Sequence, residues 1–262
     1  MTSRFAVLGS PISHSKSPAI HTAAFKAMSV DAAYDSQELS EHLAEWVQGL
    51  PDSYRGLSIT MPLKEQALAL AERADPIAIA TNAANTLVRT NTGWDAYNTD
   101  VFGIQRSISH LKVAKALVLG SGATARSAVV ALQELGIEVS IWARNSKSAK
   151  TLAFEFEALV CDDISTAKTV PLVISTLPGG ALDEYLGQLE SPSGVLLDVA
   201  YHPWPSKAAE HWGMNSTISG LEMLIWQAIG QQRLFNGNSL DEPLEAEKEV
   251  LLAIRAALEM AK

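Results

Sequence analysis

Three short segments in the first hundred residues carry side chains that suit the binding of a hydroxylated ring. Ser15 and Ser17 lie in the first segment, Thr60 and Lys64 lie in the second, and Asp100 ends the third. Hydroxyl side chains pair with the polar groups of such a ring, and an ammonium beside a carboxylate can donate a proton where charge develops on oxygen. Because a glycine-rich turn follows at residues 120–122, the pattern favours hydride transfer between a dinucleotide and a hydroxylated ring.

Residues 120–125 match the dinucleotide-binding pattern G-x-G-x-x-A. An apolar run at 116–119 predicts a strand directly before this turn, and residues 124–135 predict a helix after it. The first glycine then permits a tight turn, the second lets the backbone approach a pyrophosphate, and the anion binds N–H groups at the helix start. The expected cofactor contacts in the turn are Gly120, Ser121, Gly122, Ala123 and Thr124.

The end of the next predicted strand distinguishes between the two nicotinamide cofactors. NAD-binding proteins usually have Asp or Glu there, where the carboxylate accepts hydrogen bonds from the ribose hydroxyls. Here Ala143 and Arg144 follow the strand, Lys147 and Lys150 come next, and no acidic residue lies among them. A guanidinium can bind a 2′-phosphate through two hydrogen bonds. The sequence therefore favours NADP over NAD, with Arg144 at the phosphate.

The composition is that of an acidic globular protein. Its 262 residues are 47% apolar and carry a net charge of −9, which argues against a protein that follows a nucleic-acid backbone. No apolar run approaches the roughly 20 residues of a membrane span, and the run at 5–9 is too short for a secretory signal. The single Cys161 excludes an intrachain disulfide and is a poor basis for a metal site. We therefore expect a cytoplasmic enzyme or binding protein that takes a small molecule and has no metal, nucleic-acid or membrane partner.

Apolar runs alternate with helical patterns in the first hundred residues. Strands are expected at residues 5–8, 57–60, 86–88 and 94–97, the last two forming a hairpin. Ser17 is the expected N-cap of one helix, with Pro18 at its first position, and Pro62 is expected to start a second helix.

The alternation becomes more regular after Asp100. Strands are expected at residues 116–119, 139–142, 172–174, 195–198 and 217–218. Strands that alternate with helices predict a parallel, doubly wound sheet of the Rossmann type. A long helix at 244–260, opened by Pro243, is expected to pack back on the N-terminal part.

The expected fold class is therefore α/β, with two domains and a cleft between them. Residues 1–100 and 221–262 would form a substrate-binding and catalytic domain, and residues 101–220 an NADP-binding domain.

Six segments, in chain order, resemble motifs of the shikimate dehydrogenase family. Residues 56–64 resemble its G-x-N-V-T-x-P-x-K segment, residues 82–87 its G-A-x-N-T-L segment and residues 98–100 its N-T-D segment. The remaining matches are residues 9–21, 198–203 and 220–227. The resemblance implies a reversible, NADP-linked reduction of 3-dehydroshikimate to shikimate, a precursor step of aromatic amino-acid biosynthesis.

The resemblance also implies a function for individual residues. Ser15 and Ser17 would hold the substrate carboxylate, and Lys64 would be the acid/base residue with Asp100 as its partner. The residues expected around the rest of the ring are Thr60, Asn85, Asp100, Tyr201 and Gln227. Thr176, Val199 and Gly220 are the remaining expected cofactor contacts. His14 and His21 are expected to be structural.

The chain departs from the family pattern at several positions. Ser58 replaces the asparagine of G-x-N-V-T, Val101 replaces the glycine that commonly follows N-T-D, and Ala143 replaces the asparagine of the cofactor motif N-R-T. These changes lie outside the expected proton-transfer pair. They concern cofactor affinity and substrate range rather than the reaction class.

Three other functions compete with a biosynthetic shikimate dehydrogenase. A quinate/shikimate dehydrogenase would share the fold but use NAD, which the absence of an acidic residue after Trp142 disfavours. A non-catalytic NADP-binding sensor would have no use for Lys64 and Asp100. A methylene-tetrahydrofolate dehydrogenase would leave Ser15 and Ser17 unexplained. The sequence is compatible with either a monomer or a homodimer.

Overall fold

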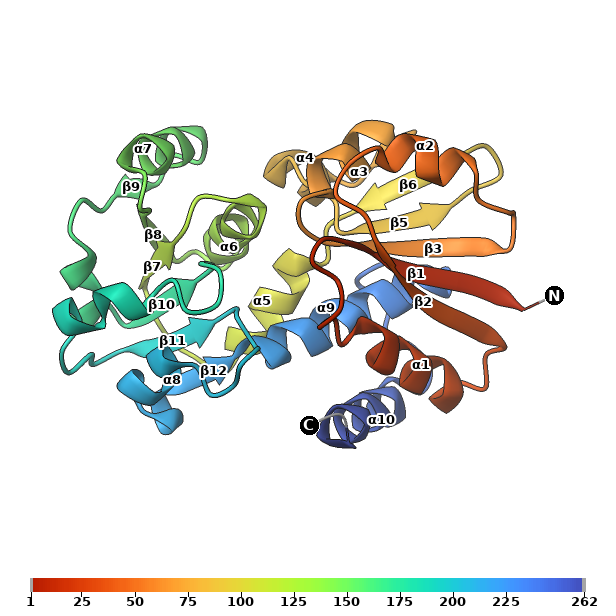
Figure 1. Cartoon of the computed structure of the whole chain (residues 1–262). Coiled ribbons are helices and arrows are strands. Elements are labelled where there is room, and N and C mark those ends of the chain that lie inside the picture. The colour runs from red at the N-terminus through yellow and green to blue at the C-terminus, as the bar shows by residue number, and fades with distance from the viewer. Residues whose placement is uncertain (1, 261–262) are drawn as a thin grey trace. The chain divides into compact units, whose positions relative to one another are not determined.

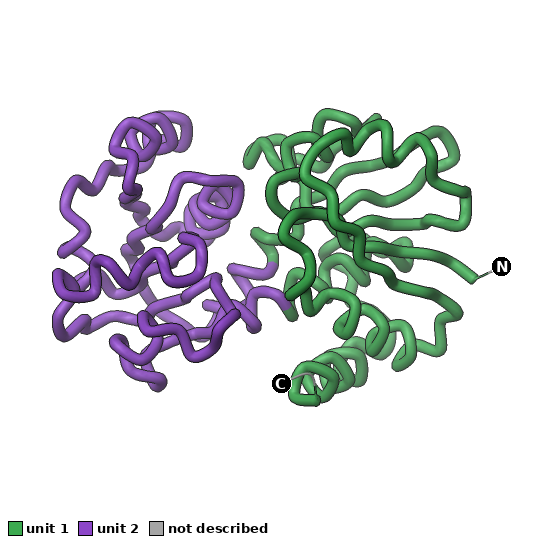
Figure 2. The backbone as a smooth tube through the Cα atoms, in the orientation of Figure 1, with its two compact units in different colours: residues 1–102, 225–262 green, residues 103–224 purple. Residues whose placement is uncertain are grey.

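The chain forms two compact units. The computed structural model describes residues 2–260, and the chain divides into residues 1–102 with 225–262, and residues 103–224 (Figure 2). The first unit is therefore discontinuous in sequence. Its boundaries differ by two and four residues from the expected domain limits at 100 and 221.

The first unit is built on a six-stranded mixed sheet. Its elements are β1 (Ser3–Gly9), α1 (Ser17–Ala27), β2 (Ala32–Glu38), α2 (Leu43–Gln48), β3 (Tyr54–Ile59), α3 (Lys64–Leu70), β4 (Arg73–Ala74), α4 (Pro76–Thr81), β5 (Thr86–Arg89), β6 (Trp94–Tyr97), the start of α5 (Asp100–Ile108), most of α9 (Gly220–Phe235) and α10 (Glu247–Met260). The strand order is β2-β1-β3-β5-β6-β4, and only β5 runs antiparallel to its neighbours. The expected hairpin is thereby confirmed as β5 and β6.

This topology brings the chemistry-bearing segments to one edge of the sheet. The carboxyl ends of β1, β3 and β6 lie at the same edge because these strands are parallel, and the antiparallel β5 begins there. The chain leaving β1 leads to Ser15, the chain leaving β3 leads to Thr60 and Lys64, and the chain leaving β6 leads to Asp100. Asn85 directly precedes β5 and lies at the same edge.

Helices cover both faces of this sheet, and the alternation of β1 explains why. Phe5 and Val7 pack with Phe25 of α1, whereas Ala6 and Leu8 face the apolar residues of α2 and α3. Helices α2 and α3 lie on one face, and α1 and α10 lie side by side on the other (Figure 1). The expectation that a C-terminal helix packs on the N-terminal part is thus confirmed. Its expected start at Pro243 was wrong, since α10 begins at Glu247.

Two expected helix starts differ from the structure. Ser17 is the first residue of α1 rather than its N-cap, which is Lys16; the hydroxyl of Ser15 accepts a hydrogen bond from the Ser17 N–H at 3.3 Å. Pro62 does not start a helix, because α3 begins at Lys64 and its N-cap is Leu63. Lys64 consequently lies at the very start of α3.

The second unit contains a six-stranded parallel sheet. Its elements are the remainder of α5, β7 (Lys115–Leu119), α6 (Ala123–Glu134), β8 (Glu138–Trp142), α7 (Ser146–Glu155), β9 (Leu159–Val160), the 3₁₀ helix η1 (Ile164–Lys168), β10 (Leu172–Ser175), η2 (Asp183–Gln188), β11 (Val195–Asp198), α8 (Lys207–Trp212), η3 (Met214–Ser216), β12 (Thr217–Ser219) and the start of α9. The strand order is β12-β11-β10-β7-β8-β9. If the strands β7 to β12 are renumbered 1 to 6 and the sheet is read from β9, the order is 3-2-1-4-5-6. This is the strand order of a dinucleotide-binding sheet.

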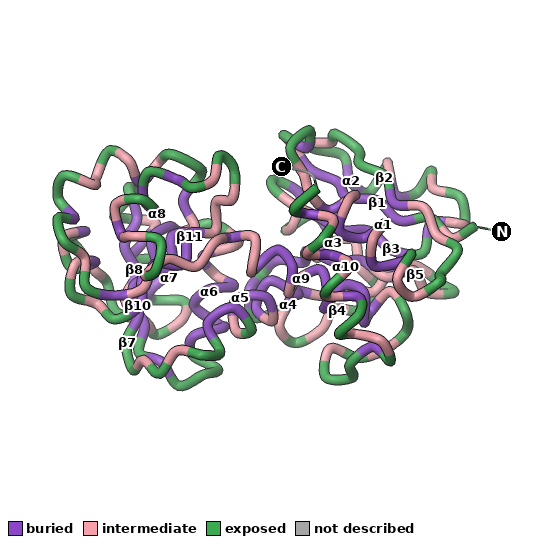
Figure 3. The backbone as a smooth tube through the Cα atoms, turned by 90° about the horizontal axis from the view of Figure 1, so that it is seen from below, coloured by how far each residue is buried: buried purple, intermediate pink, exposed green. Residues whose placement is uncertain are grey.

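Buried residues concentrate in the central strands of both sheets and in helices α6 and α9, while the loops are largely exposed (Figure 3). Leu117 and Val118 in β7 are fully buried, as expected for a parallel strand covered on both faces. Within residues 2–260, no helix is long and apolar enough to cross a membrane.

Candidate active site

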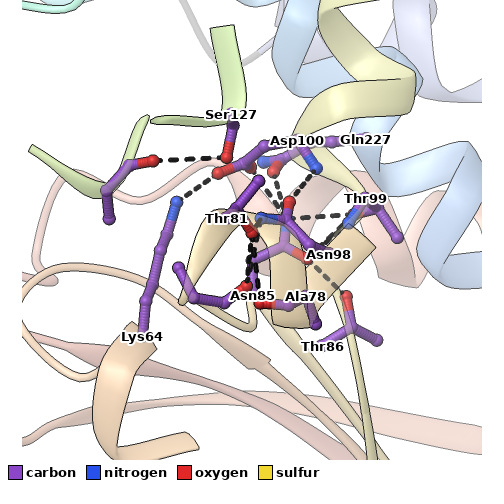
Figure 4. A network of polar contacts seen from close by, with 12 residues as sticks. Lys64, Ala78, Thr81, Asn85, Thr86, Asn98, Thr99, Asp100, Ser127 and Gln227 are labelled. Atoms are coloured by element: carbon purple, nitrogen blue, oxygen red, sulfur yellow. Dashed lines mark hydrogen bonds and ion pairs between the residues drawn. The ribbon is translucent and has the colours of Figure 1, made fainter. Parts of the chain in front are cut away.

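A buried ion pair lies at the binding edge of the first sheet. Nζ of Lys64 donates a hydrogen bond to Oδ2 of Asp100 at 2.5 Å (Figure 4). The two side chains are 11% and 2% exposed, so the lysine end is the part that solvent or a ligand can reach. Each residue is the first of its helix, α3 and α5 respectively. The helix starts therefore fix the positions of both charges.

Asn85 orients the carboxylate of this pair. Its Nδ2 lies 2.8 Å from Oδ1 of Asp100 and 3.0 Å from both Thr99 Oγ1 and Gln227 Oε1. Its Oδ1 accepts hydrogen bonds from the Thr99 N–H and from the Thr86 hydroxyl, each at 2.8 Å. The amide of Asn85 is thus occupied by protein partners on both sides. Sequence reasoning expected it to bind the ring, and the structure brings it to Asp100 and Gln227.

Asn98 fixes the start of α5. Its Oδ1 accepts a hydrogen bond from the Asp100 N–H at 2.9 Å, so it caps the helix that carries the carboxylate. Its Nδ2 donates to Thr81 Oγ1 at 2.8 Å and to the carbonyl of Ala83 at 3.1 Å. The three residues of the N-T-D segment therefore cap the helix, support Asn85 and supply the carboxylate.

The hydroxyl residues predicted for substrate binding lie at the same edge. Ser15 and Thr60 are partly exposed, and Ser17 is 8% exposed at the start of α1. Thr60 is held close to β1: its N–H donates to the Leu8 carbonyl, and a Cβ at Gly9 would lie 2.2 Å from its methyl carbon. Glycine is therefore required at position 9 for Thr60 to keep its position.

Sequence reasoning missed a second group of buried polar side chains behind this edge. Ser58 was noted only as a departure from the family motif, and Tyr34 and Gln231 were not considered. The Ser58 hydroxyl lies 2.6 Å from the Tyr34 hydroxyl and 2.9 Å from Gln231 Oε1. One signal was present: Gln231 lies one helical turn after Gln227 in α9, so both amides share one face of that helix.

His21 belongs to the same buried group. It is fully buried, its Nε2 lies 3.1 Å from Gln231 Oε1, and its Nδ1 lies 2.8 Å from Gln232 Nε2. Burial lowers the pKa of His21 to about 3, so the ring is neutral. These contacts agree with the expectation that His21 is structural.

Tyr201 is the one expected substrate ligand that belongs to the second unit. It lies in the segment after β11 and is partly buried, and burial raises its pKa. Its phenol is therefore a neutral hydrogen-bonding group at ordinary pH.

The expected cofactor residues lie at the carboxyl ends of the second sheet. The strands β7, β8, β10, β11 and β12 are followed by Gly120, Arg144, Thr176, Val199 and Gly220, respectively. In doubly wound sheets the ligand binds at these ends, beside the point where the strand order reverses. That point lies here between β7 and β10, where Gly120 and Thr176 meet.

The turn after β7 is shaped for a close ligand. Gly120 has φ +130°, and a Cβ there would lie 2.2 Å from Thr176 Oγ1, so a side chain is excluded. A Cβ at Gly122, in contrast, would meet no atom within 4 Å. Gly122 precedes α6, whose first turn has no side-chain cap and no acidic residue. The backbone N–H groups in the first turn of α6 are thus suited to bind a pyrophosphate.

The segment after β8 fits a phosphorylated ribose. Arg144 and Lys147 are exposed, and Asn145 caps α7 by accepting hydrogen bonds from the N–H groups of Lys147 and Ser148. Asn145 therefore caps the helix, and a different residue, Arg144, supplies the positive charge. The donor set suits NADP, since it offers positive charge and no carboxylate to repel a phosphate.

The segment after β11 is held by a buried carboxylate. Asp198 Oδ2 accepts a hydrogen bond from the Ser206 hydroxyl at 2.6 Å, and burial raises the pKa of Asp198. Gly220 approaches the same segment closely, since a Cβ there would lie 2.1 Å from the Val199 carbonyl oxygen. Val199 and Gly220 are therefore close neighbours, and their contact with a cofactor stays a prediction.

Comparison with known proteins assigns the family. Residues 7–87 match the model of the shikimate dehydrogenase substrate binding domain. The chain is 38% identical over 259 residues to a shikimate dehydrogenase (NADP(+)) of Anaeromyxobacter dehalogenans, a match that covers 92% of this chain and 93% of that relative. It is 32% identical over 245 residues to the Thermus thermophilus protein of the same name, covering 89% and 92%. The chain belongs to the shikimate dehydrogenase family.

Solved structures of family members have the same fold. The crystal structure of Mycobacterium tuberculosis shikimate dehydrogenase matches with a TM-score of 0.87 at 36% identity, covering 99% of this chain and all of that one (100%). The Thermus thermophilus shikimate 5-dehydrogenase in complex with NADP(H) and shikimate matches with a TM-score of 0.85 at 30% identity, covering 98% and 100%. The resemblance seen in six sequence segments is thus confirmed, as is the α/β fold with a substrate domain and a Rossmann-type domain.

Proposed function

We propose that this chain catalyses the reversible, NADP-dependent reduction of 3-dehydroshikimate to shikimate. The observation that carries the proposal is the buried pair of Lys64 and Asp100, 2.5 Å apart at the sheet edge that also holds Ser15, Ser17 and Thr60. This edge offers one proton donor and several neutral hydroxyl groups. Such a set fits a ring that carries a carboxylate, hydroxyls and one reducible ketone.

The proton transfer belongs to Lys64. NADPH, when bound, would supply the hydride, and addition of the hydride to the ketone carbon would build negative charge on the ketone oxygen. The Lys64 ammonium stabilises that charge and donates a proton to the oxygen. Asp100 holds the ammonium at one position, and Asn85 holds Asp100 through a 2.8 Å hydrogen bond. In the direction of oxidation, the neutral amine accepts the proton of the hydroxyl group.

Substrate binding uses the hydroxyl and amide groups around this pair. We assign the carboxylate to Ser15 and Ser17, which follow β1 at the same sheet edge. Thr60, Gln227 and Tyr201 would pair with the ring hydroxyls. The amide of Asn85 is already paired within the protein, so we assign it to the orientation of Asp100 and of Gln227 rather than to a strong bond with the ring.

Cofactor binding belongs to the carboxyl ends of the second sheet. The pyrophosphate would bind at the start of α6, beside Gly120 and Gly122, and Arg144 would bind the 2′-phosphate. The Thermus thermophilus relative of known structure contains NADP(H) and shikimate together. This supports the same pair of ligands for a chain that matches it over 98% of its length.

Two finer properties belong to the same proposal. We propose a cytoplasmic enzyme, since its one thiol, Cys161, has no disulfide partner in the sequence. We propose a monomer or a homodimer, which light scattering on a size-exclusion column would distinguish.

The direct test is the initial rate of oxidation of shikimate and of quinate, each with NADP⁺ and with NAD⁺. Turnover of shikimate with NADP⁺ that exceeds the other three rates supports the proposal. Faster quinate oxidation with NAD⁺ would assign the chain to quinate metabolism instead. No turnover in any combination, with NADPH still bound in a fluorescence titration, would leave a non-catalytic binder.

A further inference from the structure

The loop at residues 10–16, which follows β1, is fixed to the end of the neighbouring strand β2. The two strands are parallel and lie side by side (Figure 1), and their last residues, Gly9 and Glu38, are paired. The carboxylate of Glu38 accepts two hydrogen bonds from the loop. Its Oε1 lies 2.6 Å from the hydroxyl of Ser10, and its Oε2 lies 3.1 Å from the N–H of Ile12. One side chain of β2 therefore holds the residues that follow β1.

Ile12 transmits this constraint to Ser15. Its side chain is buried and packs with the apolar residues of β1 and α1. Its carbonyl accepts a hydrogen bond from the Ser15 N–H at 2.9 Å. The hydroxyl of Ser15 in turn accepts a hydrogen bond from the Ser17 N–H at 3.3 Å. Hydrogen bonds thus lead without interruption from the carboxylate of Glu38 to the two serines assigned to the substrate carboxylate.

A backbone hydrogen bond fixes the start of the same loop. The Ser10 N–H donates to the carbonyl of Met61 at 2.9 Å, which ties the loop to the segment after β3. Ser10 precedes Ile12, so the bond from Ile12 to Glu38 extends this support by two residues toward Ser15. The carboxylate therefore acts on the part of the loop that leads directly to the binding residue.

The charge of Glu38 cannot be explained by attraction to the ligand. Glu38 is exposed, and the hydrogen bonds from Ser10 and Ile12 lower its pKa, so it is ionised at neutral pH. A negative charge beside a loop that binds a carboxylate repels that ligand. The hydrogen bonds that Glu38 accepts give a physical reason for a carboxylate at this position.

We propose that Glu38 is a positioning residue for substrate binding, which holds Ile12 and thereby places the hydroxyl of Ser15 for the substrate carboxylate. Ser15 makes the contact with the ligand, and Glu38 fixes the loop. This inference rests on the function proposed above, because it takes Ser15 to be a carboxylate ligand.

Glu38→Met is the primary variant, since it keeps most of the side-chain length and removes both acceptor oxygens. We expect its KM for shikimate to rise about tenfold, the range of one lost hydrogen bond to an ionic group. The kcat and the KM for NADP⁺ stay within about twofold of the wild type, because Lys64 and the cofactor unit are untouched. Ser10→Ala removes only the 2.6 Å bond and should raise the KM for shikimate about threefold. This second variant tests the same connection if Glu38→Met folds poorly.

Glu38→Gln separates the hydrogen bonds from the charge. Its Oε1 can accept from the Ile12 N–H, and its Nε2 can donate to the hydroxyl of Ser10. We therefore expect a KM for shikimate within about twofold of the wild type. If Glu38→Gln raises this KM as much as Glu38→Met does, the charge is what matters, and the inference is overturned.

Asp35→Met is the matched control. Asp35 lies in the same strand, and its exposed carboxylate also accepts a hydrogen bond at 2.6 Å, from the guanidinium of Arg4. It pairs with Ala6 in the middle of β1, away from the loop. The substitution there leaves the KM for shikimate unchanged.

A double-mutant cycle with Ser15→Ala tests whether Glu38 acts through Ser15. If it does, Glu38→Met has no further effect on the KM for shikimate in the Ser15→Ala background. An equal effect in both backgrounds would overturn the inference, and so would an unchanged KM in the folded Glu38→Met variant. Wild-type protein that fails to oxidise shikimate would refute the proposed function itself, before any variant is compared.

Discussion

The buried pair of Lys64 and Asp100 can be tested for stability and for chemistry separately. Lys64→Met removes the charge and keeps much of the side-chain length. Asp100 is then left 2% exposed and without its cation, with the Asn85 amide still donating to it. Breaking a buried ion pair by removing one partner costs about 3–5 kcal/mol. Because Lys64 is 11% exposed and Asn85 remains, we expect the lower end, about 3 kcal/mol.

The double variant Lys64→Met/Asp100→Asn should restore most of that loss. It buries no charge at all, and replacing both members of a buried pair by neutral groups is often without cost. At roughly 2–4 °C per kcal/mol for a chain of this size, the single variant should melt about 6–12 °C below the wild type. The double variant should melt within about 4 °C of the wild type.

Turnover should follow a different pattern. Loss of a general acid lowers kcat by about 10²–10⁴-fold, and a neutral amide at position 100 cannot replace the ammonium, so the double variant stays as slow as the single one. Melting curves and initial rates of NADPH formation with shikimate measure both quantities on the same preparations. Recovery of turnover together with stability in the double variant would refute the catalytic assignment and leave a purely structural pair. If the single variant melts like the wild type, the estimated cost of leaving the Asp100 carboxylate buried without its cation is refuted.

Three further outcomes follow from the geometry. Arg144→Ala should raise the KM for NADP⁺ and leave that for NAD⁺ unchanged; an unaltered ratio of the two would refute the assignment of Arg144 to the phosphate. Gly120→Ala forces a side chain at φ +130° within 2.2 Å of Thr176 and should destabilise the protein by about 1–3 kcal/mol in urea unfolding, whereas Gly122→Ala should leave stability unchanged and weaken only NADP⁺ binding. His21 has a pKa of about 3 in the folded protein against 6.5 for the free side chain, so the unfolded chain takes up a proton as pH falls below 6.5 and the fold loses stability in that window. Between pH 7.5 and pH 5.5 the wild type should lose about 1.4 kcal/mol more than His21→Gln, and equal losses would show that His21 is charged in the fold.

Features that depend on neighbouring residues were predictable from the sequence. The turn after β7 was identified because its strand, its glycines and its helix are consecutive in the chain. The pairing of Lys64 with Asp100 was reached through the family resemblance. The topology gives it a physical basis, because parallel strands deliver both residues to one sheet edge.

Features that depend on distant partners were not predictable. Ser58 read as a simple departure from a motif, because its partners Tyr34 and Gln231 lie 24 and 173 positions away. The start of α3 was misplaced because a proline before a helix usually marks its first position, whereas this helix begins two residues after Pro62. Asn85 was expected to bind the ring, because its side-chain contacts with Thr86, Thr99, Asp100 and Gln227 cannot be read from the sequence.

Because the first unit is discontinuous in sequence, the second unit can fold before the first during translation. Residues 103–224 are contiguous, so this unit can fold once they have left the ribosome. The first unit can be completed only when α9 and α10 have been synthesised. Gln231 of α9 forms hydrogen bonds with Ser58 and with the Asn85 carbonyl, and α10 packs on α1. The strands that are synthesised first therefore remain without part of their cover until the last helices emerge. A nascent chain released from the ribosome only as far as residue 224 would already present the nucleotide-binding turn, while its substrate-binding residues still awaited their support.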